Sequence, residues 1–405
     1  MATPKLRFKE FDGDWTSKQL GKIIGISSAS RVFKEQWQDS GVPFFRTSDV
    51  VSIFKNKENE KAYISLELFE ELAKKSGKIK QGDLLVTGGG SIGIPYLVPN
   101  DQPLYFKDAD LLWMKSSGIV EGSFLYNFFI SPKFREYLKS ISHTGTISHF
   151  TIEQAKATPF GFPSKEEQTK IASFLSNVDE KISQLTQKHA LLSQYKQGMM
   201  QKLFSQQLRF KADDGSEFGE WETTTLGQTG KFIGGGTPSK ENSEFWEGSI
   251  PWISSSDLTE ESIFKINITR FISQNALNQS ATKLIPANSI LIVSRVGVGK
   301  VAITPNEICT SQDFTSLTLH KGSSIFFAYL IKSLTPYLLE MNQGTSIKGF
   351  IKDDLANLEL KIPCIEEQTK IANFLSAIDQ KIGVVAQQIE HAKQWKKGLL
   401  QQMFV

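Results

Sequence analysis

Cysteine is scarce in this sequence of 405 residues, which holds Cys309 and Cys364 far apart in the chain. Five scattered histidines form no cluster with them. A disulfide framework needs several cysteines, and a zinc site needs Cys or His residues at close, regular spacing. The sequence therefore predicts neither, and it favours a reducing compartment such as the cytoplasm.

Long apolar runs are also missing. The longest, residues 124–130 and 325–331, fall well short of the roughly 20 residues that a membrane-spanning helix needs. The first residues lack the apolar stretch of a signal peptide. We therefore expect a cytoplasmic protein with no membrane partner.

Neither sign of charge dominates, because 46 basic and 43 acidic residues leave a net charge of +3. So weak a global field does not by itself indicate a nucleic-acid-binding protein. Any DNA binding must then come from local patches. The hydrophobic content of 40% is ordinary for a globular protein, and the length predicts two or three domains of ~150 residues.

Recognisable catalytic motifs are absent too. The Asp/Asn-Pro-Pro-Tyr/Phe motif of adenine methyltransferases does not occur, and residues 297–300 lack the first glycine and the Ser/Thr of a phosphate-binding loop. Residues 232–236 superficially match a cofactor-binding glycine loop. Such a loop needs an acidic residue at the end of a following strand, and none follows convincingly. Residues 179–181 match an acidic-x-Lys nuclease triplet but fall on a predicted helix, where solvated charges are ordinary. The sequence predicts a non-catalytic chain with no cofactor and no metal of its own.

An internal repeat determines the organisation. Residues 166–176 (EEQTKIASFLS) recur as residues 366–376 (EEQTKIANFLS), and the offset of 200 continues without a gap to Phe204 and Phe404. Upstream the repeat is weaker: residues 43–50 correspond to 251–258, and 82–86 to 288–292. The chain thus comprises two copies of a variable domain followed by a shared tail. The predicted boundaries are 1–162, 163–207, 208–362 and 363–405.

Each tail has the pattern of a long amphipathic helix. Both follow a proline, and residues 164–167 (SKEE) match a capping box. Apolar residues then recur at alternating spacings of four and three, as in a coiled coil; if helical, residues 164–207 would be roughly 65 Å long at 1.5 Å per residue. We expect the two tails to pack on each other, antiparallel and about a pseudo-two-fold axis. The predicted interhelix seam comprises Ile171, Leu175, Val178, Ile182, Leu185, Ile371, Leu375, Ile378, Ile382 and Val385, and the same spacing continues through Tyr195 and Trp395.

Two glycines interrupt the tails at equivalent positions, Gly198 and Gly398. Glycine inside a helix costs about 1 kcal/mol relative to alanine. They mark either a close approach by a partner backbone or a frayed helix end.

The two variable domains read as a mixed α/β class (α+β). Short β-like runs at 83–87, 96–98, 289–293 and 300–303 alternate with helical stretches at 66–75, 124–140 and 325–341. We expect a twisted sheet flanked by a few helices in each domain. The sequence does not predict the order of the strands.

Candidate DNA-reading loops follow predicted strands or precede the last strand of each domain. Glycines allow a backbone to approach a phosphate, and basic or hydroxyl side chains donate to phosphates and base edges. A single such loop is more often a surface turn, and the recurrence of these loops at matching places in both copies is what makes them candidates. Residues 46–49 and 254–257 read equally as structural Asx or Ser/Thr turns. The candidates are Arg46, Thr47, Gly89, Gly90, Ser91, His143, Thr144, Thr146, His149, Lys240, Ser254, Ser255, Arg295, Lys300, Asn342, Gln343, Thr345, Ser346 and Lys348.

The doubled tail pattern P-x-x-EEQ-x-KIA-x-FL after two variable domains resembles the specificity subunits of type I restriction–modification systems (the HsdS family). The openings of the two halves, residues 7–15 and 209–211, are similar to that family, as are residues 235–239 together with Pro251 and Trp252. The first domain lacks the Gly-Gly-Thr-Pro segment of the second, so the resemblance gives less support to its loop assignments. The resemblance covers essentially the whole chain.

The resemblance implies a phage-defence protein that recognises DNA without catalysis. Each variable domain would be a target recognition domain that reads one half of a bipartite, asymmetric DNA site. The helices would set the unread spacer and bind two methyltransferase subunits, which carry S-adenosylmethionine for adenine methylation. Restriction subunits would bring ATP and Mg²⁺. The alternative is a scaffold without DNA, in which two modules on a coiled coil grip proteins; salt-dependent duplex binding would separate the two.

Overall fold

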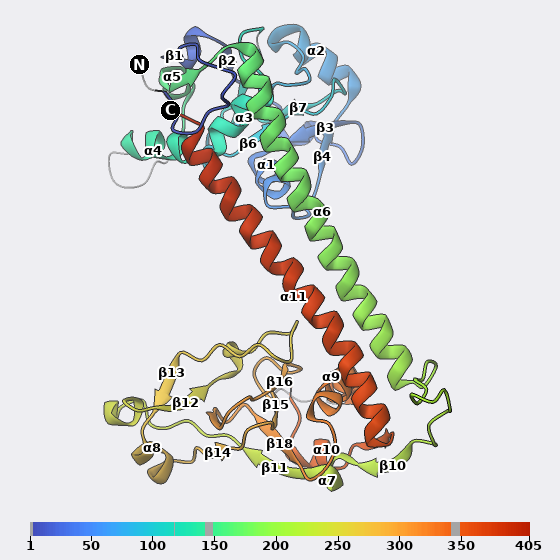
Figure 1. Ribbon diagram of the computed structural model, residues 1–405. Helices are drawn as coiled ribbons and strands as arrows, with labels where there is room; N and C mark the ends of the chain where they lie inside the picture. Colours follow the sequence, from blue (N-terminus) through green and yellow to red (C-terminus); the bar gives the residue numbers. More distant parts are fainter. Residues whose placement is uncertain (1–2, 117, 142–148, 342–348) are drawn as a thin grey trace. The chain divides into compact units, whose positions relative to one another are not determined.

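The chain divides into two compact units, which we describe from a computed structural model covering residues 3–116, 118–141, 149–341 and 349–405. Residues up to 186 together with 387–405 form the first unit, and residues 187–386 form the second. Each unit contains one globular part and a segment of each of two long helices, α6 (Lys165–Phe204) and α11 (Ile365–Gln402) (Figure 1). The bounds of the four segments predicted from the sequence stay a prediction.

Two small sheets build the globular part of the first unit. The first is antiparallel, with the strand order β2 (Gly25–Ser27), β8 (Leu111–Lys115), β5 (Leu84–Thr87) and β6 (Pro95–Leu97). The second has the order β4 (Ala62–Ile64), β3 (Val42–Phe45) and β7 (Tyr105–Phe106), with β3 and β7 parallel. A separate ladder joins β1 (Thr16–Gln19) to β9 (Pro159–Phe162).

The second unit repeats this plan. Its antiparallel sheet has the order β11 (Gly230–Gly234), β18 (Thr315–Leu319), β15 (Ile290–Ile292) and β16 (Val301–Ile303). Its other sheet has the order β13 (Arg270–Ile272), β12 (Ile250–Ile253), β17 (Ile308–Thr310) and β14 (Leu284–Ile285), with β12 and β17 parallel. β10 (Glu222–Thr225) and β19 (Glu359–Ile362) form the outer ladder.

The predicted mixed class is confirmed, but the expectation of one sheet per domain was wrong. β5 shows why, because all four of its residues are buried. Leu84 and Val86 join the core formed with the helices, whereas Leu85 joins a second core that contains Phe106 of the other sheet. A strand buried on both faces shows no alternation of polar and apolar residues, so its sequence does not reveal how many layers cover it.

The helices of the globular parts are mostly short. The first unit has α1 (Thr47–Phe54), α2 (Leu66–Ser76), α3 (Gly122–Ile130), α4 (Pro132–Ser140) and α5 (Ile152–Ala157), with 3₁₀ turns η1 (Leu20–Lys22) and η2 (Lys34–Gln36). The second has α7 (Leu226–Thr229), α8 (Gln274–Gln279), α9 (Ser324–Met341) and α10 (Lys352–Ala356), with η3 (Ser243–Trp246) and η4 (Ser255–Asp257).

The single helix predicted over 124–140 was wrong, because the chain forms two helices there. Ser131 ends α3 in an extended conformation and its hydroxyl accepts the Phe134 amide, which caps α4. Pro132 follows as the first residue of α4, a position where its missing N–H costs nothing. Proline in the corresponding part of α9, Pro336, lies inside a continuous helix.

The long helices run antiparallel within each unit, as predicted. In the first unit, Ile171 and Leu175 near the start of α6 share a core with Leu399 and Met403 near the end of α11. In the second unit, the end of α6, through Leu203, packs with the start of α11. Burying each such side chain contributes about 1.5–3 kcal/mol, so the pairing stabilises both units.

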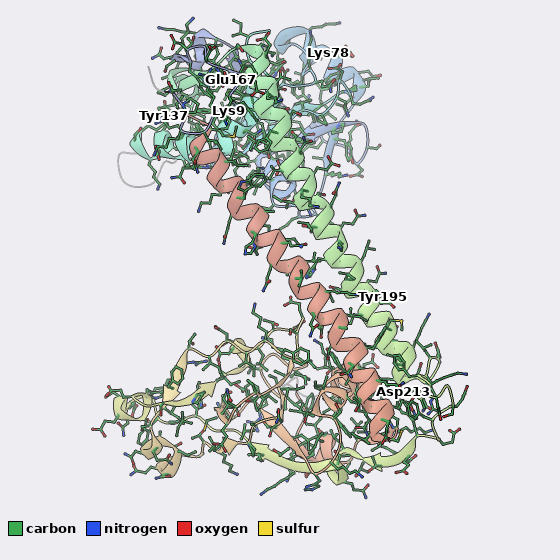
Figure 2. The ribbon with its side chains drawn as sticks, viewed as in Figure 1. Lys9, Lys78, Tyr137, Glu167, Tyr195 and Asp213 are labelled. Carbon is green, nitrogen blue, oxygen red and sulfur yellow. The ribbon has the colours of Figure 1, made fainter. Side chains whose placement is uncertain are left out.

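The heptad pattern changes toward the ends of the helices. Tyr195 and Trp395 keep the seam spacing but are about half exposed, at 51% and 54%. Figure 2 labels Tyr195 on α6. The next residue of α6, Lys196, is buried in place of Tyr195, and Met200 follows it. A methyl group placed on Gly198 or Gly398 would meet no described atom within 4 Å beyond the adjoining helix backbone, and both helices continue past these glycines. No described part of this chain approaches them closely.

The repeated EEQ segment ties each long helix to its globular part. Glu167, 1% exposed, accepts hydrogen bonds from the Arg7 guanidinium at 2.7 Å and from the Trp15 indole at 3.4 Å. The hydroxyl of Ser164 caps the helix by accepting the Glu167 amide. The predicted capping box is thus half realised, because the Glu167 carboxylate binds Arg7.

The second unit builds the same joint around Glu367. Its carboxylate accepts from Arg209 at 2.7 Å and from the Trp221 indole at 3.1 Å. Hydrogen bonding to Glu367 raises the pKa of Arg209, as Glu167 does for Arg7. The most strongly repeated motif of the sequence therefore has a structural role inside each unit.

Candidate nucleic-acid interface

Three of the predicted polar segments meet in the first unit. The glycine loop after β5 is held by a hydrogen bond from the Phe150 amide to the Gly88 carbonyl and by a bridge from Gly89 to His149. Its Gly90 has φ +67°, and a Cβ placed on it would lie 3.8 Å from the Thr47 methyl group at the start of α1. The chain after β5, the chain after β3 and the chain before α5 thus converge on one place.

The second unit brings together the equivalent segments. The loop after β15 places Gly297, with φ +82°, beside Ser255 of η4. The Ser294 carbonyl accepts the amide of Phe350. Because the same three segments meet in both units, they are the best candidate for a shared binding surface.

An arginine is fixed at this place in the first unit. The side chain of Asp49 accepts the Arg46 backbone amide at 2.8 Å and its guanidinium at 2.9 Å. The guanidinium also lies 5.6 Å from the centre of the Trp37 ring, in cation–π geometry. Hydrogen bonding to Asp49 raises the pKa of Arg46. The segment therefore caps α1 and at the same time holds a cation.

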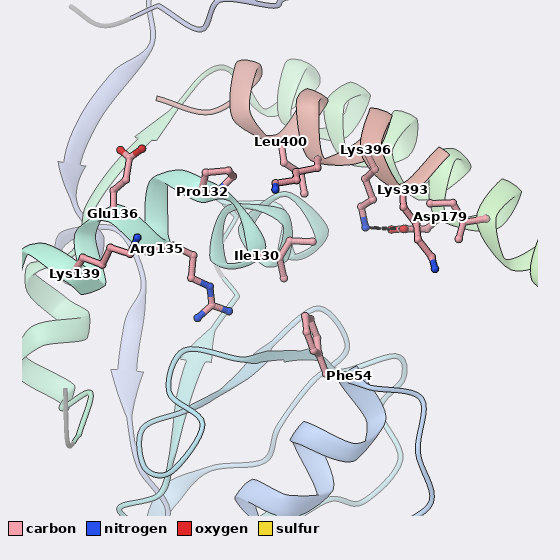
Figure 3. A pocket seen from close by; sticks show the side chains of 12 residues that line it. Phe54, Ile130, Pro132, Arg135, Glu136, Lys139, Asp179, Lys393, Lys396 and Leu400 are labelled. Atoms are coloured by element: carbon pink, nitrogen blue, oxygen red, sulfur yellow. Dashed lines mark hydrogen bonds and ion pairs between the residues drawn. The ribbon is translucent and has the colours of Figure 1, made fainter. Parts of the chain in front are cut away.

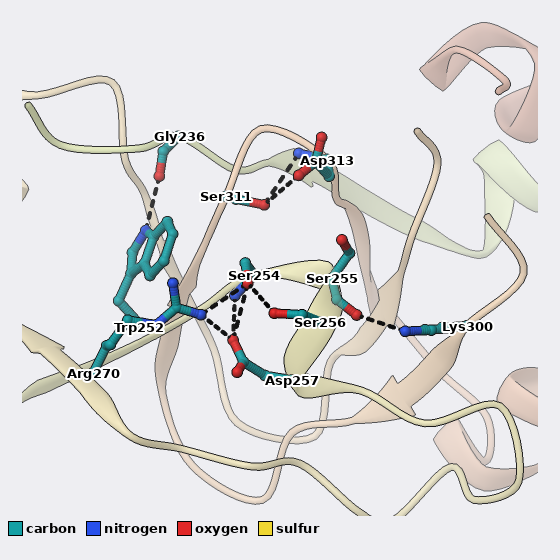
Figure 4. A network of polar contacts seen from close by, with 10 residues as sticks. All are labelled: Gly236, Trp252, Ser254, Ser255, Ser256, Asp257, Arg270, Lys300, Ser311 and Asp313. Carbon is teal, nitrogen blue, oxygen red and sulfur yellow. Dashed lines mark hydrogen bonds and ion pairs between the residues drawn. The ribbon is translucent and has the colours of Figure 1, made fainter. Parts of the chain in front are cut away.

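The second unit holds an arginine in the same way but takes it from another strand (Figure 4). Asp257 accepts the Ser254 amide at 2.7 Å, as Asp49 accepts that of Arg46. Arg270 on β13 then donates to Asp257 and to the Ser254 hydroxyl. Its guanidinium lies 4.6 Å from the centre of the Trp252 ring.

Sequence reasoning missed Arg270. In the strand registers, Arg270 faces Trp252 where Ala62 faces Phe44, so no arginine occurs at its position in the first copy. Both units thus combine an aspartate, an aromatic ring and an arginine, but the arginine comes from a different strand position in each unit. No motif in a single chain signals such a transposition.

The remaining predicted residues differ in whether they are hydrogen-bonded inside the unit or exposed. Lys300 donates to the Ser255 carbonyl at 3.0 Å, which makes it part of the internal network. Arg295 is exposed in the loop after β15, and Lys240 is exposed before η3. In the first unit, Gly89 is buried, whereas Gly90, Ser91 and His149 are exposed.

Several predicted residues lie outside the described part of the chain. They are His143, Thr144, Thr146, Asn342, Gln343, Thr345, Ser346 and Lys348. The segments that contain them connect to the described residues His149 and Gly349, which lie at the candidate surface.

The described residues of the surface offer hydrogen-bond donors. Guanidinium, amine, hydroxyl and exposed loop amides donate to phosphate oxygens and to the acceptor edges of bases. Within the ranges the structure describes, no cluster of His, Cys, Asp or Glu could hold a metal ion. In the same ranges no helix has the length and apolarity to cross a membrane.

Taken together, the repeated units define a two-domain recognition protein with an antiparallel helix pair. The family model for the type I restriction modification DNA specificity domain matches residues 12–194 and again 219–394. The chain therefore belongs to this family.

Curated relatives agree with this assignment. The putative type I restriction enzyme MjaX specificity subunit of Methanocaldococcus jannaschii is 25% identical over 98% of this chain and 94% of its own length. The MjaIX specificity subunit of the same organism is 31% identical, but the alignment covers 40% of this chain and 39% of the relative. The EcoR124I/EcoR124II specificity subunit of Escherichia coli is 37% identical over 40% of this chain and 41% of the relative.

Solved structures share the fold. The S subunit of a type I restriction–modification system from M. genitalium has a TM-score of 0.58 at 18% identity, covering 100% of this chain and 99% of that one. A chain from a study of complex assembly and conformational transition in a type I R-M system has a TM-score of 0.62 at 18% identity, with 97% and 98% covered. Identity this low supports the fold alone.

Proposed function

We propose that this chain is the DNA-specificity subunit of a type I restriction–modification system. Each unit reads one half of a bipartite, asymmetric duplex site through the surface where its three polar segments meet. The observation that carries the proposal is the recurrence of this surface in both units of a chain of the specificity family, with different side chains in each copy. Shared architecture with altered donors is what two different half-sites require.

The chain itself recognises DNA and performs no catalysis. Adenine methylation, with S-adenosylmethionine, belongs to two methyltransferase subunits that the helices recruit, and ATP-driven cleavage with Mg²⁺ belongs to restriction subunits. The complex acts where the cell's DNA is, in the cytoplasm. The helix pair fixes the length of unread DNA between the half-sites.

A domain exchange tests this proposal. Residues 208–362 are replaced by the matching segment of a relative with a different specificity, and methylated adenines are mapped across the genome. We expect one half-site to change while the other half and the spacer stay the same. Exchange of residues 1–162 is the matched control and should change the opposite half. A change in both halves after either exchange would contradict reading by separate units.

Binding to duplex DNA separates this function from a protein scaffold. Contacts to phosphates release counterions, so the logarithm of the binding constant falls linearly with the logarithm of the salt concentration, with a slope of about −0.9 per phosphate on duplex DNA. We expect that dependence for the assembled complex. Absence of duplex binding at every salt concentration would favour the scaffold.

A further inference from the structure

A basic cavity of about 840 Å³ lies in the first unit, and none of the candidate reading residues lines it (Figure 3). Its walls come from the end of α1, from α3 and α4, and from the facing segments of α6 and α11. Five cations line it: Arg135, Lys139, Lys393, Lys396 and Lys397. Two carboxylates, Glu136 and Asp179, oppose them.

The carboxylates do not neutralise this charge. Asp179 is taken by Lys396, whose amine lies 2.6 Å away. Lys393 pairs with Glu390 on the exposed helix surface, a contact of little strength. Within the described residues, no carboxylate lies within ion-pair distance of Arg135, Lys139 or Lys397. The cavity therefore keeps a net positive charge.

Of the five cations, Arg135 is the one whose charge a bound anion would stabilise most. Its side chain is half-buried, and among the described residues its guanidinium donates one hydrogen bond, to the Ile92 carbonyl at 3.1 Å. Burial lowers the pKa of Arg135, because the guanidinium has lost water without gaining a counter-charge. An anion in the cavity would replace the lost water and accept hydrogen bonds from the guanidinium.

The internal repeat indicates that part of this charge is not needed for the fold. Lys396 corresponds to Lys196, and both pair with an aspartate of the other long helix. Lys393 and Lys397, in contrast, correspond to Ser193 and Gln197 at the same helix positions. Two lysines have thus been added in one copy only, beside the first unit's cavity.

The cavity is linked to the reading surface by two elements. Helix α1 begins at Thr47, in the reading segment, and ends at Phe54 on the cavity wall. Eight helical residues span about 12 Å, which equals roughly three to four nucleotides at 3.4 Å per step. Arg135 is also bonded to Ile92, which belongs to the glycine loop. A duplex engaged at the loops would have its next phosphates within that range.

We propose that this cavity binds a backbone phosphate of the duplex outside the bases read by the first unit. The inference rests on the proposed function, because it presumes that the loops engage DNA. A phosphate contact carries no base information, so it adds affinity and register and leaves the target sequence unchanged. The second unit, with serine and glutamine at the two added positions, lacks this contact.

The test replaces the added lysines by the residues of the other copy, in the variant Lys393→Ser with Lys397→Gln. The matched control, Lys181→Ser with Lys188→Gln, removes the same charge from exposed positions of α6 that make no described ion pair. Both variants are assembled with the methyltransferase subunits. Binding to a fluorescent duplex carrying the mapped site, and to a duplex without it, is then measured by anisotropy at several salt concentrations.

We expect the cavity variant to reduce the magnitude of the salt slope by about one and the affinity at ~0.1 M salt by about tenfold, equally on both duplexes. The control should keep the wild-type slope. A neutral methylphosphonate placed at each phosphate in turn should weaken wild-type binding at a position where the cavity variant is indifferent.

Three results would overturn the inference. They are an unchanged salt slope, a loss confined to the cognate duplex, and failure of the variant to assemble with the methyltransferase subunits; the last would make the cavity a protein-binding site. Failure of the wild-type complex to bind either duplex would instead remove the proposed function itself.

Discussion

Lys396 and Asp179 face each other across the long helices of the first unit, with Nζ and Oδ1 2.6 Å apart. The second unit contains Lys196 and Asp379 at the same distance. Under the offset of 200 residues these are the same two positions with the helices exchanged, since α6 supplies the acid in one unit and the base in the other. This arrangement requires antiparallel helices, because a parallel pair would place the two aspartates side by side.

The two pairs differ in burial, and their contributions to stability should differ accordingly. The side chains of Lys196 and Asp379 are 8% and 6% exposed, whereas those of Lys396 and Asp179 are 16% and 47% exposed. Replacing Lys196 by methionine should lower the free energy of unfolding by about 3 kcal/mol, because it leaves a buried carboxylate without its cation. Replacing Lys396 by methionine should cost less than about 1 kcal/mol. Urea unfolding of both variants measures this, and equal losses would contradict it.

The joint at Glu367 offers a second test. Changing Glu367 to alanine removes the partner of the Arg209 guanidinium and of the Trp221 indole together. We expect the free energy of unfolding to fall by about 2–4 kcal/mol, the range for breaking a buried charged network. The neighbouring Glu366 is exposed, and changing it to alanine should alter the free energy of unfolding by no more than about 0.5 kcal/mol. If both variants unfolded at the same urea concentration, the joint would have no energetic importance.

The long helices could be predicted in detail from the sequence because their signal is local. Spacings of four and three fix a helix face, and the gap-free repeat fixes which faces are equivalent. The end of the seam could not be predicted, because Tyr195 satisfies the spacing as well as any apolar residue. Its neighbour Lys196 is buried only because Asp379 of the other helix lies opposite, which is a tertiary fact.

The candidate site was predictable in its loops and not in its side chains. Glycines after a strand mark a place where the backbone turns sharply, and Gly90 and Gly297 do adopt positive φ there. The arginines depend on strand register instead. Arg46 lies at the end of its own strand, whereas Arg270 arrives from a neighbouring strand, and a pairing register is not encoded in local spacing.

Lys332 should make the stability of the second unit depend on pH. Burial, and next the charge of Lys196, lower the pKa of Lys332 to about 8, well below its ordinary value of 10.5. Between these two values the unfolded chain binds a proton that the folded chain has released. The contribution of Lys332 to the free energy of unfolding should therefore rise as the pH increases from about 8 to 10.5.

The change Lys332→Met isolates this contribution. The difference in unfolding free energy between wild type and variant, followed by urea titration, should shift by about 2–3 kcal/mol in favour of the wild type over that interval. Lys265 is exposed, and Lys265→Met should give a difference that is flat with pH. A flat difference for Lys332→Met as well would show that the amine is not held in its neutral form.

The proposed role of the helix pair as a spacer gives the last prediction. Seven residues, copied from 180–186, are inserted after Thr186 in α6, and the equivalent seven, copied from 380–386, after Ala386 in α11. One heptad keeps the seam in phase and lengthens a helix by about 10 Å at 1.5 Å per residue, which equals roughly three base pairs at 3.4 Å each. Mapping methylated adenines should therefore show the same two half-sites separated by about three more unread base pairs.

Insertions that break the seam supply the control. Two residues in place of seven would rotate the apolar stripe of each helix by about 200°, away from its partner, and we expect that variant to lose methylation altogether. Seven residues in one helix alone would leave the facing positions out of register and should fail in the same way. An unchanged spacer in the double heptad variant would mean that the methyltransferase subunits, and not the helices, determine the distance between half-sites.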